Sequence, residues 1–319
     1  MTCFHPLTAY QYKYRKNDNG KSLVVFDFAK VYKEFGALWS QHVDEVKLPC
    51  GHCIGCRLSQ ARDWAVRICH ESALYASDRC FFLTLTYNDE SIQHLRQMSN
   101  LKDHKVYYSL SKRDFQLFMK RLRKKFGSGI RFFACGEYGS INQRPHYHVI
   151  VWNLDLPDLV LWRKDGYSFY FRSTILESLW PYGFSVVGRV SYDSACYVAR
   201  YCTKKITGDM AKDHYFGRTP EFSLMSRRPG IGSRWLEKYS SDVYNYDVVI
   251  FKNLKLRPPR YYDKLFEVLH PDEMEVIKKR RKVVALSSSF TCERLQVLER
   301  SAKIRLSRKK RKIESEVLL

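Results

Sequence analysis

The stretch EYGSINQRPHYHVIVW, residues 137–152, decides the fold, because two histidines stand at the start of a run of β-branched and aromatic residues. Such a composition is typical of a central β-strand. Side chains alternate between the faces of a strand, so His146 and His148 point one way and Tyr147 the other. Two neutral imidazoles on one face can bind one divalent cation. Two hydrogen-bonded or exposed histidines would have the same spacing, so other residues must decide.

A carboxylate precedes the histidines at a useful distance. A hard ion such as Mg²⁺ or Mn²⁺ prefers at least one carboxylate beside imidazole ligands. Glu137 ends the strand predicted at 129–139, and a strand–turn–strand would bring it alongside His146. We expect Glu137, His146 and His148 to form a metal site, with an exposed turn carboxylate as the alternative interpretation of Glu137.

The neighbouring segments alternate between strand and helix patterns. Apolar spacing predicts further strands at 80–87 and 183–190, and helices that begin near Ser111, Ser173 and Asp193. This order indicates an α+β fold, an antiparallel sheet flanked by helices. Basic or polar residues on these elements and on the loop SRRPGIGSRW (226–235) are candidate DNA contacts: Thr84, Thr86, Lys124, Lys125, Arg227 and Arg228.

The charge of the whole chain favours a polyanion as partner. Its 319 residues carry a formal net charge of +22, and 15% are aromatic, too many for a disordered basic tail. A folded, basic, aromatic-rich chain suits nucleic acid first and an acidic membrane surface second. No apolar run approaches the length of a membrane span, and the first residues lack a signal peptide's apolar core, so we expect a cytosolic protein.

Three cysteines in LPCGHCIGC, Cys50, Cys53 and Cys56, have the spacing of a metal-binding cluster. Structural zinc takes four ligands, so one more is needed. The candidates for the fourth ligand are Cys3, His52, His5, Cys69 and His70. We favour Cys3, because an isolated N-terminal thiol would otherwise have to be tied down. An iron–sulfur cluster and free thiols in a turn are the alternatives.

The composition changes beyond about residue 215. A proline-stiffened connection leads into a basic region whose densest blocks are KKRRK (278–282) and RKKRK (308–312). Such blocks form solvated faces or disordered ends, or they bind DNA phosphates. We therefore divide the chain into an N-terminal hairpin, cysteine-cluster and helix region (1–75), a central core (76–215) and a basic helical C-terminal region (216–319).

The helix predicted at 193–206 contains YVARYCTKK. Tyr197 and Tyr201 are four residues apart and share one helical face, and Lys204 and Lys205 follow. Such a pair is commonly core packing. Beside a metal ion, however, a phenol can act as a nucleophile on an activated phosphorus.

Three motifs together carry a resemblance. FFLTLTY, then Glu137 before PHYHV, then YVARYCTKK resemble the three motifs of the HUH endonucleases, in the same order. With CFHPL and LPCGHCIGCR, the whole chain resembles the replication initiators of small single-stranded DNA phages, the microviruses of the gokushovirus type. The resemblance implies an antiparallel sheet like that of an RNA-recognition domain.

The resemblance also implies roles. His146, His148 and Glu137 match the ligands of a catalytic Mg²⁺ or Mn²⁺. Tyr197 and Tyr201 match the paired nucleophiles of rolling-circle initiators, and Lys204 or Lys205 matches the lysine that follows them. The implied reaction nicks and joins single-stranded origin DNA through a 5′-phosphotyrosyl link, in the cytoplasm of a bacterial host. No Walker-type loop is present, so a host helicase and a DNA polymerase are expected partners. The alternatives are a zinc-containing single-strand binder without catalysis and a plasmid initiator or transposase of the same superfamily.

Overall fold

A computed structural model describes residues 3–18, 20–99, 105–139, 142–166, 168–201, 205–206, 210–251, 253–287 and 291–317, without the side chains of Tyr201, 286–287 and 309–317. The chain forms two compact units. One contains Met1–Ser59 and Arg280–Leu319, and the other contains Gln60–Lys279. The functional division at residues 75 and 215 stays a prediction.

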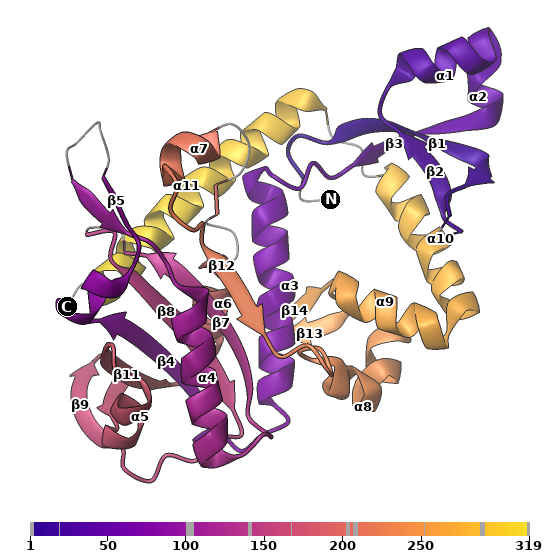
Figure 1. The fold of residues 1–319 in the computed structure, drawn as a ribbon. Coiled ribbons are helices and arrows are strands. Elements are labelled where there is room, and N and C mark those ends of the chain that lie inside the picture. Colours follow the sequence, from indigo (N-terminus) through magenta and orange to yellow (C-terminus); the bar gives the residue numbers. More distant parts are fainter. Residues whose placement is uncertain are drawn as a thin grey trace. The chain divides into compact units, whose positions relative to one another are not determined.

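The larger unit is built on a seven-stranded sheet (Figure 1), and every strand pair in it is antiparallel. Its strand order is β12-β7-β8-β4-β11-β10-β9. The strands are β4 (Cys80–Tyr87), β7 (Arg131–Tyr138), β8 (Pro145–Trp152), β9 (Val160–Asp165), β10 (Ser168–Arg172), β11 (Gly183–Arg189) and β12 (Phe222–Met225). The prediction of an antiparallel α+β fold is confirmed.

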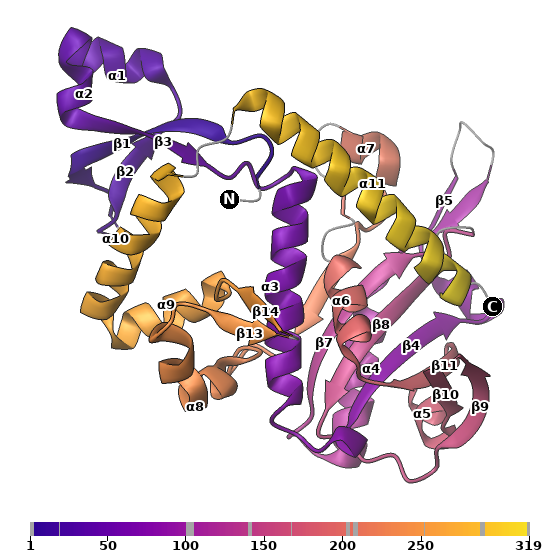
Figure 2. The ribbon, with the colours of Figure 1, turned by 180° about the vertical axis from the view of Figure 1, so that it is seen from behind.

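Helices cover both faces of this sheet, as Figures 1 and 2 show from opposite sides. On one face α4 (Lys112–Phe126) buries Phe115, Phe118 and Leu122 against the sheet. The residues of α4 that pack there recur at helical spacing, and Ser111 caps the helix by accepting a hydrogen bond from the Asp114 amide. On the other face lie α3 (Ile54–Ser72) and α6 (Tyr192–Tyr201).

The second face is packed with small residues, which lets its two helices approach the strands closely. Ala65 of α3 and Ala195 and Ala199 of α6 are buried together with Ile150 and Trp152 of β8. Because His146 and His148 share the strand face of Ile150 and Trp152, the α6 side of the sheet is also the histidine side.

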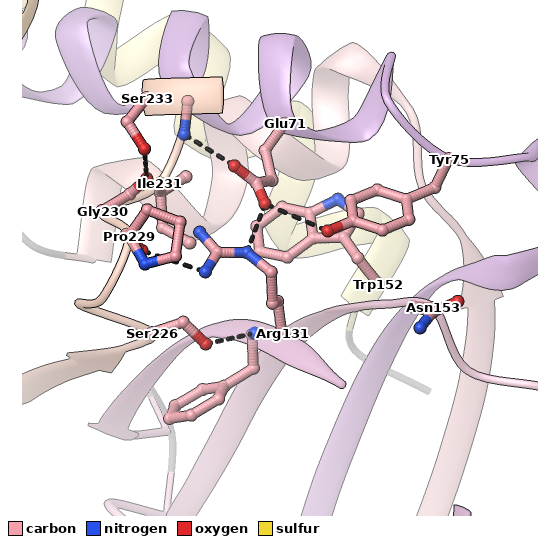
Figure 3. A network of polar contacts seen from close by, with 12 residues as sticks. Glu71, Tyr75, Arg131, Trp152, Asn153, Ser226, Pro229, Gly230, Ile231 and Ser233 are labelled. Carbon is pink, nitrogen blue, oxygen red and sulfur yellow. Dashed lines mark hydrogen bonds and ion pairs between the residues drawn. The ribbon is translucent and has the colours of Figure 1, made fainter. Parts of the chain in front are cut away.

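A buried ion pair ties α3 to the sheet and to the loop after β12 (Figure 3). Arg131 donates from Nε to Oε1 of Glu71 at 2.5 Å, and the Gly232 amide donates to Oε2 of Glu71 at 2.7 Å. Arg131 also donates to the Pro229 carbonyl at 2.9 Å. The basic, glycine-bearing loop is thus clamped from beneath rather than held by its own exposed residues.

The remaining elements of the larger unit are short strands and helices. They are β5 (Gln97–Ser99), β6 (Val106–Tyr108), β13 (Val249–Phe251), β14 (Leu254–Leu256), α5 (Thr174–Leu179), α7 (Met210–Tyr215), α8 (Ser233–Tyr244), α9 (Arg260–Leu269) and most of α10 (Pro271–Ser287). Tyr262 of α9 and Leu236 of α8 are buried in a core of their own with Val66 of α3.

The smaller unit has a three-stranded antiparallel sheet in the order β2-β1-β3. Its elements include β1 (Leu7–Lys16), β2 (Ser22–Val25), β3 (Val43–Leu48), α1 (Phe28–Phe35), α2 (Trp39–His42) and α11 (Cys292–Val317). Tyr12, Val31 and Val43 form its buried core. In the described part of the chain, no helix combines the length and apolarity needed to cross a membrane.

One predicted boundary is wrong. The helix expected to run from 193 to 206 ends at Tyr201, and Lys205 and Ile206 are not helical. Tyr215 donates to Glu221, and the Ile206 amide donates to the Tyr215 hydroxyl at 2.9 Å. This hydrogen bond satisfies the Ile206 amide outside the helix, so continued apolar spacing in the sequence did not extend it.

Candidate active site and cysteine cluster

Glu137, His146 and His148 lie together at the β7–β8 pair. Glu137 is the register partner of His146, and His148 follows two residues later on the same face. Oε1 of Glu137 lies 2.7 Å from Nε2 of His146 and 3.1 Å from Nε2 of His148. The three ligand atoms lie within 4.8 Å of one another. The structure therefore brings together the three residues that the sequence proposed as a metal site.

The other nitrogen of each ring is already engaged. Nδ1 of His146 lies 3.1 Å from the Arg144 carbonyl, which can only accept, so this nitrogen carries the hydrogen. Nδ1 of His148 lies 3.1 Å from Oγ1 of Thr84. In a neutral His146 the Nε2 lone pair then faces the carboxylate of Glu137, and only a proton or a cation between them relieves the repulsion.

The carboxylate is buried but charged. Glu137 is 3% exposed. Burial raises the pKa of Glu137, but hydrogen bonds from His146 and His148 outweigh it and lower the pKa to about 2. A buried carboxylate oxygen and two convergent imidazole nitrogens match the donor set of Mg²⁺, Mn²⁺ or a similar divalent ion.

Tyr197 of α6 lies beside this group. Its ring centroid is 5.1 Å from that of His148, edge to face at 79°. Phe82 of β4 stacks on the other side of His148, with centroids 5.5 Å apart at 10°. The buried Ala195 and Ala199 hold α6 close to the sheet, which places the Tyr197 side chain against the histidine. A phenol thus stands next to a candidate metal ligand.

The remaining residues of that motif are described only in part. Tyr201 is the last residue of α6, and its side chain lies outside the described part of the structure. Lys204 also lies outside the described residues. Lys205 is exposed. The role of each of these residues stays a prediction.

The four cysteines Cys3, Cys50, Cys53 and Cys56 form a second cluster, in the smaller unit. Their sulfurs lie within 4.8 Å of one another. Sγ of Cys3 is 3.6 Å from Sγ of Cys50 and 3.9 Å from that of Cys53, and the Cys50–Cys56 separation is 4.0 Å. Four sulfurs around a tetrahedral zinc lie about 3.8 Å apart, given a Zn–S bond of about 2.3 Å. The arrangement fits a four-cysteine metal site.

Backbone amides point at the sulfurs, as in a site built for thiolates. The amides of Phe4, Cys50 and Cys53 each donate to a cluster sulfur at 3.3 Å. Burial raises the pKa of Cys53, but hydrogen bonds from the Phe4 and Cys56 amides and from neighbouring thiols outweigh it and lower the pKa to about 6. A thiolate at neutral pH is the form that binds a metal.

Of the candidates for the fourth ligand, the structure places Cys3 in the cluster. His52 is exposed, and His5 hydrogen-bonds Glu299 at 2.9 Å. His70 instead lies 3.0 Å from the Tyr262 hydroxyl. The fourth position could not be fixed by sequence spacing, because Cys3 lies 47 residues before Cys50.

Comparison with known proteins gives the family. A family of replication-associated proteins, described by its ORF2 member, matches residues 80–206. The chain is 31% identical over 287 residues to replication-associated protein VP4 of Bdellovibrio phage phiMH2K, covering 86% of this chain and 79% of that protein. It is 32% identical over 308 residues to replication-associated protein ORF2 of Spiroplasma virus 4, covering 91% and 88%. This chain belongs to the phage replication-associated proteins.

A third member of this family, replication-associated protein ORF4 of Chlamydia phage 1, is 26% identical over 72% of this chain and 55% of its own length. No solved structure matches the chain. The matched segment 80–206 begins at β4 and includes β7, β8 and α6, so it contains the Glu137–His146–His148 group and Tyr197. As a phage replication-associated protein, the chain has a role in initiating phage DNA replication.

The predicted DNA contacts of this replication-associated protein fall in three places. Thr84 and Thr86 are the register partners of His148 and His146, so they lie on the metal face. Lys124 and Lys125 are exposed on α4, on the opposite face of the sheet. Arg227 and Arg228 are exposed in the loop that pairs with the beginning of β7, whereas Glu137 is near its end. The structure brings only the two threonines to the histidines.

Sequence reasoning missed three contacts in this site. Thr84 was expected to bind DNA, and its contact with His148 was not foreseen. The Arg144 carbonyl and the Phe82 ring were not considered. The semi-polar face of the segment 80–87 was the available signal, because Phe82, Thr84 and Thr86 share that face of the strand.

Proposed function

We propose that this chain nicks and rejoins single-stranded DNA at a phage origin, as a metal-dependent HUH-type endonuclease of rolling-circle replication. The single observation that carries the proposal is the position of the Tyr197 ring, 5.1 Å from the ring of His148, a residue of the Glu137–His146–His148 group. A phenol and a divalent-ion site at this separation can address one phosphate. The family's role in replication initiation supports the same interpretation.

The reaction is a transesterification. The Tyr197 oxygen attacks the scissile phosphorus, a Tyr–O–P bond forms, and the P–O bond to the 3′ carbon breaks. The products are a 5′-phosphotyrosyl link and a free 3′-hydroxyl, which a polymerase can extend. A divalent ion, when bound, withdraws charge from the scissile phosphate. Glu137, His146 and His148 would hold that ion, with Thr84 and the Arg144 carbonyl fixing the orientation of the imidazoles.

The second tyrosine serves repeated rounds. The phosphotyrosyl link keeps the energy of the original phosphodiester, so rejoining needs no nucleotide hydrolysis. Tyr201 stands one turn after Tyr197 on α6 and is proposed to cut the regenerated origin while Tyr197 still holds DNA. Lys204 or Lys205 is proposed to stabilise the developing phenolate by its positive charge.

The cysteine cluster is proposed to hold one structural Zn²⁺ through Cys3, Cys50, Cys53 and Cys56. Four thiol ligands leave no open position for a substrate, which is typical of structural rather than catalytic zinc. The proposed place of action is the cytoplasm of a bacterial host, where a host helicase and DNA polymerase would supply unwinding and synthesis.

The rival function is a zinc-containing protein that binds single strands without cutting them. A denaturing gel separates the two, because only an enzyme leaves a covalent protein–DNA species. We expect this species with single-stranded origin DNA and Mn²⁺, and we expect EDTA to abolish it. His146→Ala should lose cleavage and keep most DNA affinity, because phosphate contacts dominate binding.

Tyrosine variants locate the nucleophile. Tyr197→Phe and Tyr201→Phe should each retain some nicking, and the double variant should form no adduct, since each change removes a hydroxyl and little volume. Tyr192→Phe, on the same helix, is the matched control and should keep the adduct. Mass spectrometry that finds the DNA on a residue outside α6, or an adduct in the double variant, would refute the proposal.

A further inference from the structure

The hairpin β9–β10 extends the histidine face of the sheet toward one edge. Strand register carries this face outward from the metal group: His146 pairs with Thr86, and Thr86 pairs with Phe184 of β11. Paired residues share a face, so Phe184 lies on the histidine side, two strand spacings or about 10 Å from His146. The next strand outward is β10, followed by β9 at the edge.

An exposed group of two rings and a guanidinium occupies this extension. Phe184 is 52% exposed and Trp162 of β9 is 50% exposed. The Arg172 guanidinium carbon lies 5.9 Å from the centroid of Phe184 and 5.7 Å from that of Trp162. Glu177 holds Arg172 by an ion pair at 3.0 Å from its Nε. Large apolar rings are costly to expose, and here a fixed cation lies between them.

A second row of rings joins this group to the metal ligands. Phe82 stacks on His148, and Gly188 is the register partner of both Phe82 and Tyr170 of β10. A Cβ at Gly188 would lie 3.7 Å from Cδ1 of Phe82 and 4.0 Å from Cδ1 of Tyr170. The glycine thus leaves the two rings as neighbours on the face that starts at His148.

We propose that Trp162, Arg172 and Phe184 form a binding site for the bases of single-stranded DNA next to the scissile phosphate. Unpaired bases expose flat π-faces that stack on aromatic and guanidinium groups, whereas bases in a duplex have theirs covered. The continuity of this face with the metal group, and the further cations Arg163 and Lys164 on β9, suit a strand whose backbone is anionic. The inference rests on the proposed function, because it assigns the path of the same DNA substrate.

The hairpin supplies its own matched control. Phe169 precedes Tyr170 on β10 and therefore points to the opposite face, and it is 45% exposed. The experiment measures fluorescence anisotropy of a labelled single strand of about 20 nucleotides, long enough to cover one such site, and of the corresponding duplex in EDTA. We compare the full-length wild type, Trp162→Ala/Phe184→Ala, the conservative Trp162→Phe/Phe184→Tyr, and Phe169→Ala.

The double alanine variant should bind the single strand at least about tenfold more weakly, since stacking on an aromatic side chain contributes at least that much for each base. Its duplex affinity, the conservative variant and Phe169→Ala should stay within about twofold of wild type on the same reasoning. Unchanged single-strand affinity would overturn the inference. So would equal losses for single strand and duplex, or a variant that alters only self-association in sedimentation.

The outcome is separable from that of the proposed function, because binding in EDTA needs no cleavage. A wild type that never forms an adduct, together with the predicted loss of single-strand affinity, refutes the nicking proposal and keeps this site. A wild type that nicks normally, with unchanged affinity in the double alanine variant, refutes this site alone.

Discussion

Oγ1 of Thr84 lies 3.1 Å from Nδ1 of His148, its register partner across the β4–β8 pair. Nε2 of the same ring lies 3.1 Å from Oε1 of Glu137. The imidazole is therefore held from both sides, by a hydroxyl on one strand and a carboxylate on another. Thr84 acts on the metal site by orienting a ligand, without being a ligand itself.

Removing this hydroxyl should weaken metal binding. Thr84→Val keeps the shape of the side chain but takes the hydroxyl away from Nδ1 of His148, so we expect Mn²⁺ affinity to fall about 10- to 100-fold. Calorimetric titration with Mn²⁺ measures it. Thr86→Val, the equivalent change opposite His146, is the control, because Nδ1 of His146 is held by the Arg144 carbonyl instead. Equal losses in both variants would contradict the assignment.

Zinc content and stability should depend on Cys3 together with the CxxCxxC segment. We expect about one zinc per chain, as one four-sulfur site requires. Cys3→Ser should lose the metal and unfold the smaller unit first, because structural zinc contributes folding free energy directly. Elemental analysis and limited proteolysis follow both effects. Cys292→Ser, at an exposed cysteine, should change neither. Iron in a freshly purified sample would contradict the zinc assignment.

The buried Glu71–Arg131 pair should be costly to break. The side chain of Glu71 is fully buried and that of Arg131 is 7% exposed. Glu71→Ala leaves Arg131 and the Gly232 amide without their acceptor, so we expect a loss of about 3–5 kcal/mol in the free energy of unfolding, measured with urea.

An exposed pair provides the comparison. Glu267 and Lys278 pair at 2.5 Å, with side chains 44% and 52% exposed. Glu267→Ala should cost less than about 1 kcal/mol. Similar losses in the two variants would show that burial does not decide the strength of the Glu71–Arg131 contact.

His70 should make stability depend on pH. Burial lowers the pKa of His70 from 6.5 to about 4, and its ring stacks on Trp235 at a centroid distance of 3.5 Å. Between these values the unfolded chain binds a proton that the native chain does not, so the free energy of unfolding falls as the pH drops through this interval. The slope is at most about 1.4 kcal/mol per pH unit.

Replacement by a group that does not titrate tests this directly. His70→Gln should remove this part of the slope in urea unfolding measured at several pH values. His270→Gln, where the side chain is 43% exposed, should leave the slope in place. A wild-type slope that survives in His70→Gln would mean that another group is responsible.

Several features of the site could be predicted from local sequence. The H-x-H spacing placed His146 and His148 on one face, since the strand period is two. The four-residue spacing of Tyr197 and Tyr201 placed both on α6, since the helical period is about 3.6. The extent of α6 could not be predicted this way, because the contact of Ile206 with Tyr215 lies outside any local period.

The sequence by itself determined the residue types of the site, the faces they share along each strand or helix, and the cysteine spacing, because these follow from local periodicity. Only the tertiary structure decided which partners complete them. It placed Cys3 beside Cys50, Thr84 against His148, and the hairpin β9–β10 at the edge of the histidine face. These contacts join residues far apart in the chain, and they depend on strand register and helix packing, which the side-chain period of one segment does not contain.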